Sequence, residues 1–130
     1  MYLQAVASRV QRKGDMSMKF NPNCVRDILI TVEENTGYGE PISFGEDADI
    51  YTTLQKYDIA ETMYHIDQCL QSGLIIGKKN IWGQFRIDDL TPDGHSLLGK
   101  IRSDKLWKEI LSRGVSAIPT LIEIASLIVG

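Results

Sequence analysis

The sequence predicts an α+β domain that is mostly helical, in the order helix, short strand, two helices, β-hairpin and three further helices. Three observations predict this class. Apolar residues recur at helical spacing in several segments, and these segments begin at residues typical of a helix N-terminus. A strand-like segment and an alternating segment flank a glycine-containing turn, which indicates a hairpin. Glycines follow most of the helical segments, where the chain must turn.

Length and composition indicate one soluble domain. The chain has 130 residues, 43% of them hydrophobic and 24% charged, and its net charge of −3 does not suggest a polyanion binder as a whole. Cys24 and Cys69 fit no paired spacing, which favours buried thiols in a reducing compartment. No apolar run approaches the ~18 residues of a membrane span, and the N-terminus lacks the apolar region of a secretory signal. We therefore expect a cytoplasmic protein that does not bind membranes.

We divide the chain into an extension, a core and a C-terminal helical part. Residues 1–18 are expected to be an N-terminal extension without a function of its own, in which a short apolar stripe ends at Gly14 and Asp15. Residues 19–102 are expected to form the core. Residues 103–130 are expected to form helices that pack on this core or build a dimer interface.

The first helix of the core is predicted from about Asn21 to Asn35. Asn21 is a good N-cap, and Pro22 suits the first helical position because its missing N–H has no helical partner there. Gly37 lies just past the helix, where glycine most easily adopts a left-handed conformation. One face carries the apolar residues Val25, Ile28, Leu29 and Val32.

A strand and a short helix are predicted next. Residues 40–44 read as a strand, and Pro41 places it at a sheet edge because proline cannot donate to a ladder. A second, short helix is expected within residues 46–57. It is centred on the apolar residues Ile50, Tyr51 and Leu54.

The third helix follows across a tight turn at residues 56–58, which is helix-turn-helix spacing. Asp58 is its predicted N-cap, with Glu61 three residues later completing a capping box, and Gly73 ends it. The predicted buried stripe of this helix is Ile59, Met63, Ile66 and Leu70.

A β-hairpin and a fourth helix come after Gly73. Residues 74–76 are strand-like, and residues 84–87 alternate so that Phe85 and Ile87 share one face. The turn residues between them are Gly77, Asn80 and Gly83. The next helix begins with Thr91 as N-cap and Pro92 as its first residue. Its predicted buried side consists of Gly94, which lets another backbone come close, and Leu97, Leu98 and Ile101.

Two helices complete the chain. The first is capped by Ser103 or Asp104 and ends at Gly114. The second is capped by Ser116 and is apolar nearly all round, because its only charged residue is Glu123. Such a helix must be buried, either centrally against the core or against a second copy. The dimer interpretation places Leu121, Ile124, Leu127 and Ile128 in the interface.

The first six elements have the winged-helix order, in which three helices form the core and the hairpin forms the wing. The segment "LTPDGHSLL" (90–98) is similar to the junction between wing and helix in many winged-helix regulators. The motifs "VRDIL…VEEN", "YHID-C-L-SGLI", "LTPDGHSLLGKIRSDKLWKEI" and "VSAIPTLIEIAS" together resemble an uncharacterised bacterial and phage family, a domain of unknown function. The resemblance runs from Lys19 to Val129. It implies a winged-helix-like fold and no particular activity.

Catalytic and metal sites are not expected. His65 and Cys69 are one helical turn apart, as zinc ligands can be, but two further ligands are missing, and His65 is expected to be exposed. Asp93 and His95 are two residues apart on a helix, so their side chains do not face each other. No nucleophile elbow, P-loop or dinucleotide fingerprint is present. We expect no enzymatic activity, no cofactor, no metal and no small-molecule substrate.

Nucleic-acid binding is the function that a winged helix suggests. The helix after the turn would enter the major groove, with Gln68, Gln71 and His65 facing the bases. Residues 58–77 carry three acidic side chains and no basic one, which opposes this contact. On the wing, Lys78, Lys79 and Arg86 are the candidate phosphate contacts. Trp82 is a candidate wedge or stacking residue, or else a cap on the core, and Lys100 and Arg102 would extend the basic strip.

We therefore expect a DNA-binding protein or transcription regulator of phage or mobile-element origin, which binds double-stranded DNA as a homodimer. The alternative is a protein-interaction module that keeps the winged-helix shape and does not bind DNA. The acidic second and third helices favour this alternative.

Overall fold

The computed structural model describes residues 18–45 and 50–129. The predicted N-terminal stripe and the first part of the predicted second helix lie outside these residues. In the described part of the chain, no helix has both the length and the apolar character needed to cross a bilayer.

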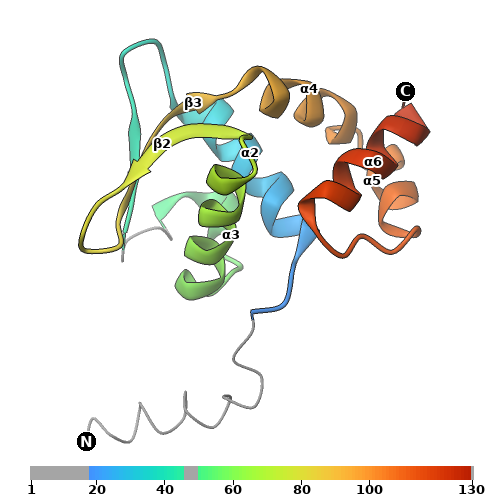
Figure 1. Cartoon of the computed structure of the whole chain (residues 1–130), viewed down its shortest axis with the longest axis horizontal. Coiled ribbons are helices and arrows are strands. Elements are labelled where there is room, and N and C mark those ends of the chain that lie inside the picture. Colours follow the sequence, from blue (N-terminus) through green and yellow to red (C-terminus); the bar gives the residue numbers. More distant parts are fainter. Residues whose placement is uncertain (1–17, 46–49, 130) are drawn as a thin grey trace, which may run out of the picture.

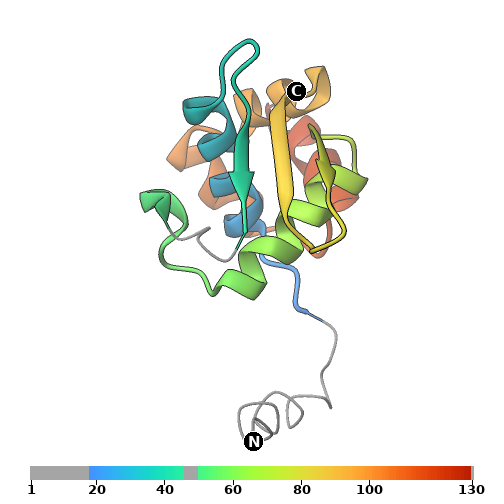
Figure 2. The ribbon, with the colours of Figure 1, turned by 90° about the vertical axis from the view of Figure 1, so that its left-hand side faces the viewer.

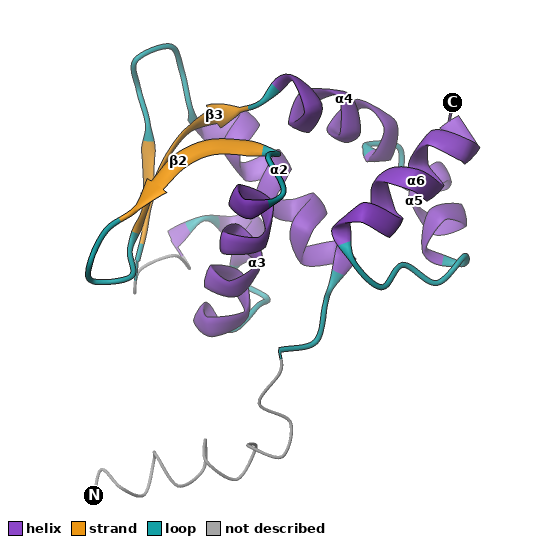
Figure 3. Ribbon diagram, in the orientation of Figure 1, coloured by secondary structure: helices purple, strands orange, loops and turns teal. Residues whose placement is uncertain are grey.

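The predicted class, a mostly helical α+β fold, is confirmed (Figure 1, Figure 3). The three strands form an antiparallel sheet in the order β1-β3-β2. Figure 2 looks onto this sheet, with most of the helices behind it. The elements are α2 (Pro22–Asn35), β1 (Ile42–Phe44), the 3₁₀ turn η3 (Thr52–Leu54), α3 (Ile59–Gln71), β2 (Ile75–Lys79), β3 (Phe85–Leu90), α4 (Pro92–Ile101), α5 (Asp104–Leu111) and α6 (Ile118–Val129).

Helix α2 forms as predicted, and its N-cap is confirmed. The Asn21 side chain accepts a hydrogen bond from the backbone N–H of Asn23, and Pro22 is the first helical residue. The predicted apolar face is fully buried and packs under the sheet. Strand β1 is an edge strand, as Pro41 predicts, and its neighbour is β3 through the pair Ile42–Ile87.

The predicted second helix is not α-helical in its described part, residues 50–57. This part contains the 3₁₀ turn η3, and Ile50 is also in a 3₁₀ conformation. Leu54 is buried and Ile50 is exposed. Thr52 and Thr53 are β-branched and lower the helix propensity of this segment. The Tyr51 ring instead packs on Phe44 at 5.3 Å between ring centroids, which draws the segment towards β1.

Helix α3 is rotated relative to the predicted stripe. The residues that it buries are Thr62, His65, Ile66 and Cys69, whereas Ile59 is exposed and Met63 and Leu70 are only partly buried. The predicted exposure of His65 is therefore wrong. The predicted capping box is also absent, because the Asp58 side chain makes no capping bond and the Glu61 carboxylate accepts from the Asn21 side-chain amide instead.

Helix α4 begins as predicted. The Thr91 hydroxyl accepts from the Gly94 N–H at 2.9 Å and donates to the Gly73 carbonyl at 2.6 Å. Gly94 packs directly on the chain at Leu74, where a Cβ atom would lie 2.0 Å from the Leu74 carbonyl oxygen. The predicted apolar side of α4 is buried. The α4 N-terminus is thus locked onto the segment that joins α3 to β2.

Helices α5 and α6 pack on the side of the molecule away from the hairpin (Figure 1). Ser103, not Asp104, caps α5. Helix α6 begins at Ile118, so the residue before it is Ala117 and not the predicted cap Ser116. The Ala117 carbonyl accepts from the N–H of Leu121.

The predicted dimer residues on α6 divide into two groups. Leu121 and Ile124 are buried in the core of the single chain, so they are not available to a second copy. Leu127 is 75% exposed and Ile128 is partly buried. The prediction erred for the first two because the inward face of a helix that is apolar all round is not marked by its own sequence.

Arg26 joins α2 to the start of α5. Its guanidinium donates to the carbonyls of Ile101 and Arg102 and to the Asp104 carboxylate, and it lies 5.3 Å from the centroid of the Trp107 ring. Its side chain is only 14% exposed and its bond to the Ile101 carbonyl is partly buried, whereas the Asp104 carboxylate is exposed.

Arg26→Lys is expected to lower the free energy of unfolding by about 2 kcal/mol, because an ammonium cannot reproduce the planar fork of bonds. The matched change Asp104→Ala removes the exposed partner and is expected to cost about 0.5 kcal/mol. Urea unfolding of both variants checks this prediction. Equal losses would show that the surface ion pair, and not the carbonyl bonds, carries the interaction.

Candidate functional site

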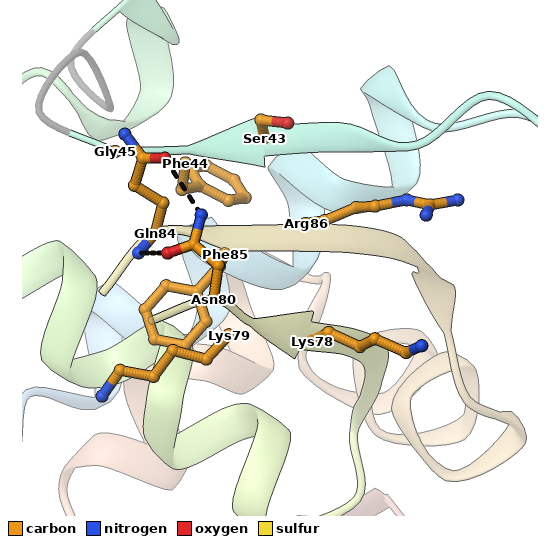
Figure 4. Close-up of a pocket in the computed structure, with 9 residues that line it drawn as sticks. All are labelled: Ser43, Phe44, Gly45, Lys78, Lys79, Asn80, Gln84, Phe85 and Arg86. Atoms are coloured by element: carbon orange, nitrogen blue, oxygen red, sulfur yellow. Dashed lines mark hydrogen bonds between the residues drawn. The ribbon is translucent and has the colours of Figure 1, made fainter. Parts of the chain in front are cut away.

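The outer face of the sheet carries a row of three polar side chains, one from each strand (Figure 4). Arg86 on β3 is the cross-strand partner of Ser43 on β1 and of Lys78 on β2, and all three are exposed. Two like charges directly opposite each other destabilise a sheet. The Asp88 carboxylate, 3.3 Å from the Arg86 guanidinium, compensates only in part. A bound anion would compensate more fully.

A groove of about 530 Å³ runs along this row. Its polar lining includes hydroxyl, amide and cationic groups, which together can donate several hydrogen bonds to an anion. Among the residues that the structure describes, no carboxylate lines it. The lining residues are Ser43, Phe44, Gly45, Lys78, Lys79, Asn80, Gln84, Phe85 and Arg86.

Lys79 is separated from the other two cations of the hairpin. It follows Lys78 on the same strand and alternates towards α3 (Figure 4). Its ammonium lies 3.9 Å from the Asp67 carboxylate and 5.6 Å from the centre of the Phe85 ring. The predicted cluster of Lys78, Lys79 and Arg86 is therefore a pair on the outer face and a third cation at the junction with α3.

The hairpin loop is held by one side chain. The Asn80 side-chain oxygen accepts from the N–H groups of Trp82 and Gln84, both at 2.9 Å, and Gly83 supplies the positive φ of 81° that closes the loop. Ile81 is 88% exposed and Trp82 is 78% exposed. The alternative that Trp82 caps the core is therefore wrong.

Helix α3 presents few groups to a ligand. Gln71 is exposed, and Gln68 is partly buried. Glu61 is bonded to Asn21, and Asp67 lies near Lys79. His65 has no exposed surface, so the prediction that it faces DNA bases is wrong.

His65 has a structural role. Its Nε2 accepts from the backbone N–H of Asn21 at 2.8 Å, which leaves Nδ1–H to donate to the Glu61 carbonyl, also at 2.8 Å. The rings of Phe20 and Tyr64 lie beside it. Burial lowers the pKa of His65 and outweighs the opposing effect of Glu61. The imidazole therefore binds the start of α2 to α3 as a neutral ring.

A polar cluster around the buried Asp27 escaped the sequence analysis. The Tyr57 hydroxyl donates to the Asp27 carboxylate at 2.6 Å, and the Lys56 ammonium lies 3.1 Å from the same group. Burial and the Asp27 bond raise the pKa of Tyr57. Asp27 is a charged residue among the buried residues of the amphipathic helix α2, and its place beside the apolar face was the available signal. The cluster fixes the turn before α3 against α2.

The two cysteines are free and buried. Burial raises the pKa of Cys69 to about 12 and also raises that of Cys24, so both stay as thiols at neutral pH. Within residues 18–45 and 50–129, no three His, Cys, Asp or Glu side chains are grouped to hold a metal ion.

The remaining candidates lie apart from the hairpin. His95 is half exposed and lies 3.7 Å from Asp89, not beside Asp93, in agreement with the helical spacing. Lys100 donates to Ser126 on α6, and Arg102 is paired with Glu33 on α2. These two cations lie at the end of α4 away from the hairpin (Figure 1) and do not continue its basic strip.

Comparison with protein families identifies the class of this chain. The family described as "Hypothetical protein (DUF2513)", a domain of unknown function, matches residues 19–115, which are most of the chain. The chain therefore belongs to this family, and the predicted membership is confirmed. Comparison with curated proteins and with solved structures gives no match.

Proposed function

We propose that this protein is a winged-helix protein that binds duplex DNA through the phosphate contacts of its β2–β3 hairpin. The order α2, β1, η3, α3, β2, β3 supports the winged-helix assignment, with η3 as a reduced second helix and the hairpin as the wing. Helix α3 packs against β2, which is an edge strand of the sheet, so a wing at this place can reach the same ligand as that helix.

The observation that carries the proposal is the pair formed by Lys78 and Arg86. The two side chains are direct cross-strand partners on an open sheet face. Like charges in this arrangement cost stability, and a phosphate group placed between them removes the cost. Ser43 adds a hydroxyl donor next to Arg86. Such backbone contacts position a protein on DNA without reading its sequence.

The acidic surface of α3 favours a second candidate, a protein-interaction module without DNA binding. Asp67 lies near Lys79 and Glu61 is bonded to Asn21, but both remain negative groups on the helix that would enter the major groove. In the DNA-binding proposal, the hairpin therefore provides the main electrostatic contact, and Gln68 and Gln71 provide the only base-reading groups of α3.

A salt titration tests the two candidates. We expect wild-type protein to bind a random-sequence duplex with an affinity that falls steeply with salt, and the double variant Lys78→Gln/Arg86→Gln to bind more weakly. Losing two phosphate contacts makes the slope of log K against log salt shallower by about 1.8.

The matched control is Lys105→Gln/Lys108→Gln, which removes the same charge from exposed positions on α5, away from the hairpin. We expect the control to keep the wild-type slope. Equal weakening by both pairs would assign the binding to overall charge, and no binding at low salt would favour the protein-interaction module.

A further inference from the structure

The tip of the hairpin exposes two large apolar side chains that are not buried in the core of the fold. Ile81 and Trp82 are among the most exposed large hydrophobic residues in the described chain. The other tryptophan, Trp107, is buried and donates its ring N–H to Asn23. Because Trp82 has so little contact with the core, its removal is expected to leave the stability of the fold unchanged.

The tip is also rigidly built. The Asn80 side chain accepts from two backbone N–H groups of the loop, the Asn80 N–H donates to the Gln84 carbonyl at 2.8 Å, and the Gly83 N–H donates to the Asn80 carbonyl at 3.1 Å. A loop that is already fixed pays little conformational entropy when it binds. Trp82 is thus presented in a defined position.

The charge around the tip indicates what it contacts. Residues 75–87 include Lys78, Lys79 and Arg86 and no acidic residue, whereas Asp88 and Asp89 lie further along β3. The part of the hairpin nearest its tip is therefore cationic and ends in an aromatic ring. A polyanion with flat aromatic faces matches both features, because bases stack on tryptophan while phosphates pair with the cations. Membrane docking would use a broad apolar face, whereas these two side chains form a narrow tip.

We propose that Trp82, supported by Ile81, inserts at a base step of duplex DNA that is already distorted, such as a single-nucleotide gap. This inference rests on the proposed DNA binding and names its preferred substrate. Opening a stacked step costs free energy, whereas a gap supplies an unstacked base at no such cost. The hairpin cations then hold the phosphates on either side.

Affinity measurements with two duplexes of the same sequence, one intact and one with a single-nucleotide gap, test the proposal. We expect wild-type protein to bind the gapped duplex about tenfold more tightly, because one base–aromatic stack is gained. Trp82→Ala is expected to remove this preference and to keep the salt dependence of binding to the intact duplex. Trp82→Phe, which retains a ring, is expected to keep part of the preference.

Fluorescence gives a direct readout of stacking. In the Trp107→Phe variant, Trp82 is the only tryptophan, since the chain has two. We expect the gapped duplex to quench its emission and to protect it from acrylamide. A thermal melt confirms that this variant is folded, and the Trp82→Ala affinities do not depend on it.

The outcomes separate the two proposals. Equal affinity for both duplexes with no effect of Trp82→Ala overturns the insertion of Trp82, while a loss of affinity in Lys78→Gln/Arg86→Gln would still support phosphate contacts by the hairpin. No binding to either duplex overturns both. A blue shift of Trp82 emission with phosphatidylserine vesicles, without any response to DNA, would assign the tip to a membrane surface and overturn the inference.

Discussion

Replacing Gly94 with alanine is expected to lower the free energy of unfolding by about 3 kcal/mol or more, as overpacking against a fixed backbone does. The new Cβ would lie 2.0 Å from the Leu74 carbonyl oxygen. That oxygen also accepts from the Thr91 N–H at 3.0 Å, and the Thr91 hydroxyl bonds to the Gly73 carbonyl. Moving α4 away to make room would therefore break the bonds that hold its N-terminus in place.

Gly99 on the same helix supplies the matched control. A Cβ at this exposed position meets nothing within 4 Å, so Gly99→Ala is expected to raise the stability by up to about 1 kcal/mol through helix propensity. Chemical unfolding with urea measures both variants. A loss below about 1 kcal/mol for Gly94→Ala would show that the contact between α4 and Leu74 relaxes easily.

The start of α4 could be predicted because its signals are local. Thr91, Pro92 and Gly94 lie within four consecutive residues, and each acts through its own backbone position or the turn next to it. The same holds for the Asn21 cap of α2. Capping residues and glycines report the geometry of the chain around them, so the order of helices and strands was largely readable.

The buried side of α3 could not be predicted because its determinant is distant in sequence. Counting apolar residues selected Ile59 and Met63, whereas the core receives His65. A histidine can be buried when both ring nitrogens are bonded, and one of its partners, Asn21, is 44 residues away. Hydrophobic periodicity contains no information about such a partner.

The candidate site was predicted in its residue types and not in its arrangement. The basic residues of the hairpin were visible in the sequence, but strand register decides that Lys78 is paired with Arg86 and that Lys79 turns towards Asp67. The bulge between Ile76 and Gly77 contributes to that register, because an extra residue on one strand changes which positions share a face.

The stability of the wild-type protein is expected to fall as the pH is lowered from about 6.5, the ordinary pKa of histidine. Burial lowers the pKa of His65 in the folded state, so the unfolded chain takes up the proton more readily. The stabilisation is complete above the unfolded pKa and is lost as the pH falls towards the folded one. The slope in this window reaches about 1.4 kcal/mol per pH unit.

Urea unfolding between pH 7.5 and pH 5 measures this effect above the range where most carboxylates titrate. His65→Gln offers an acceptor and a donor that do not titrate, so we expect this variant to lose the slope attributed to His65. His65→Phe leaves the Asn21 N–H without its acceptor and is expected to cost about 2 kcal/mol at neutral pH. His95→Gln, at a half-exposed position, is the control for exchanging a histidine for glutamine at neutral pH. If His65→Gln keeps the wild-type slope, protonation of His65 is not what lowers the stability of this fold at acidic pH.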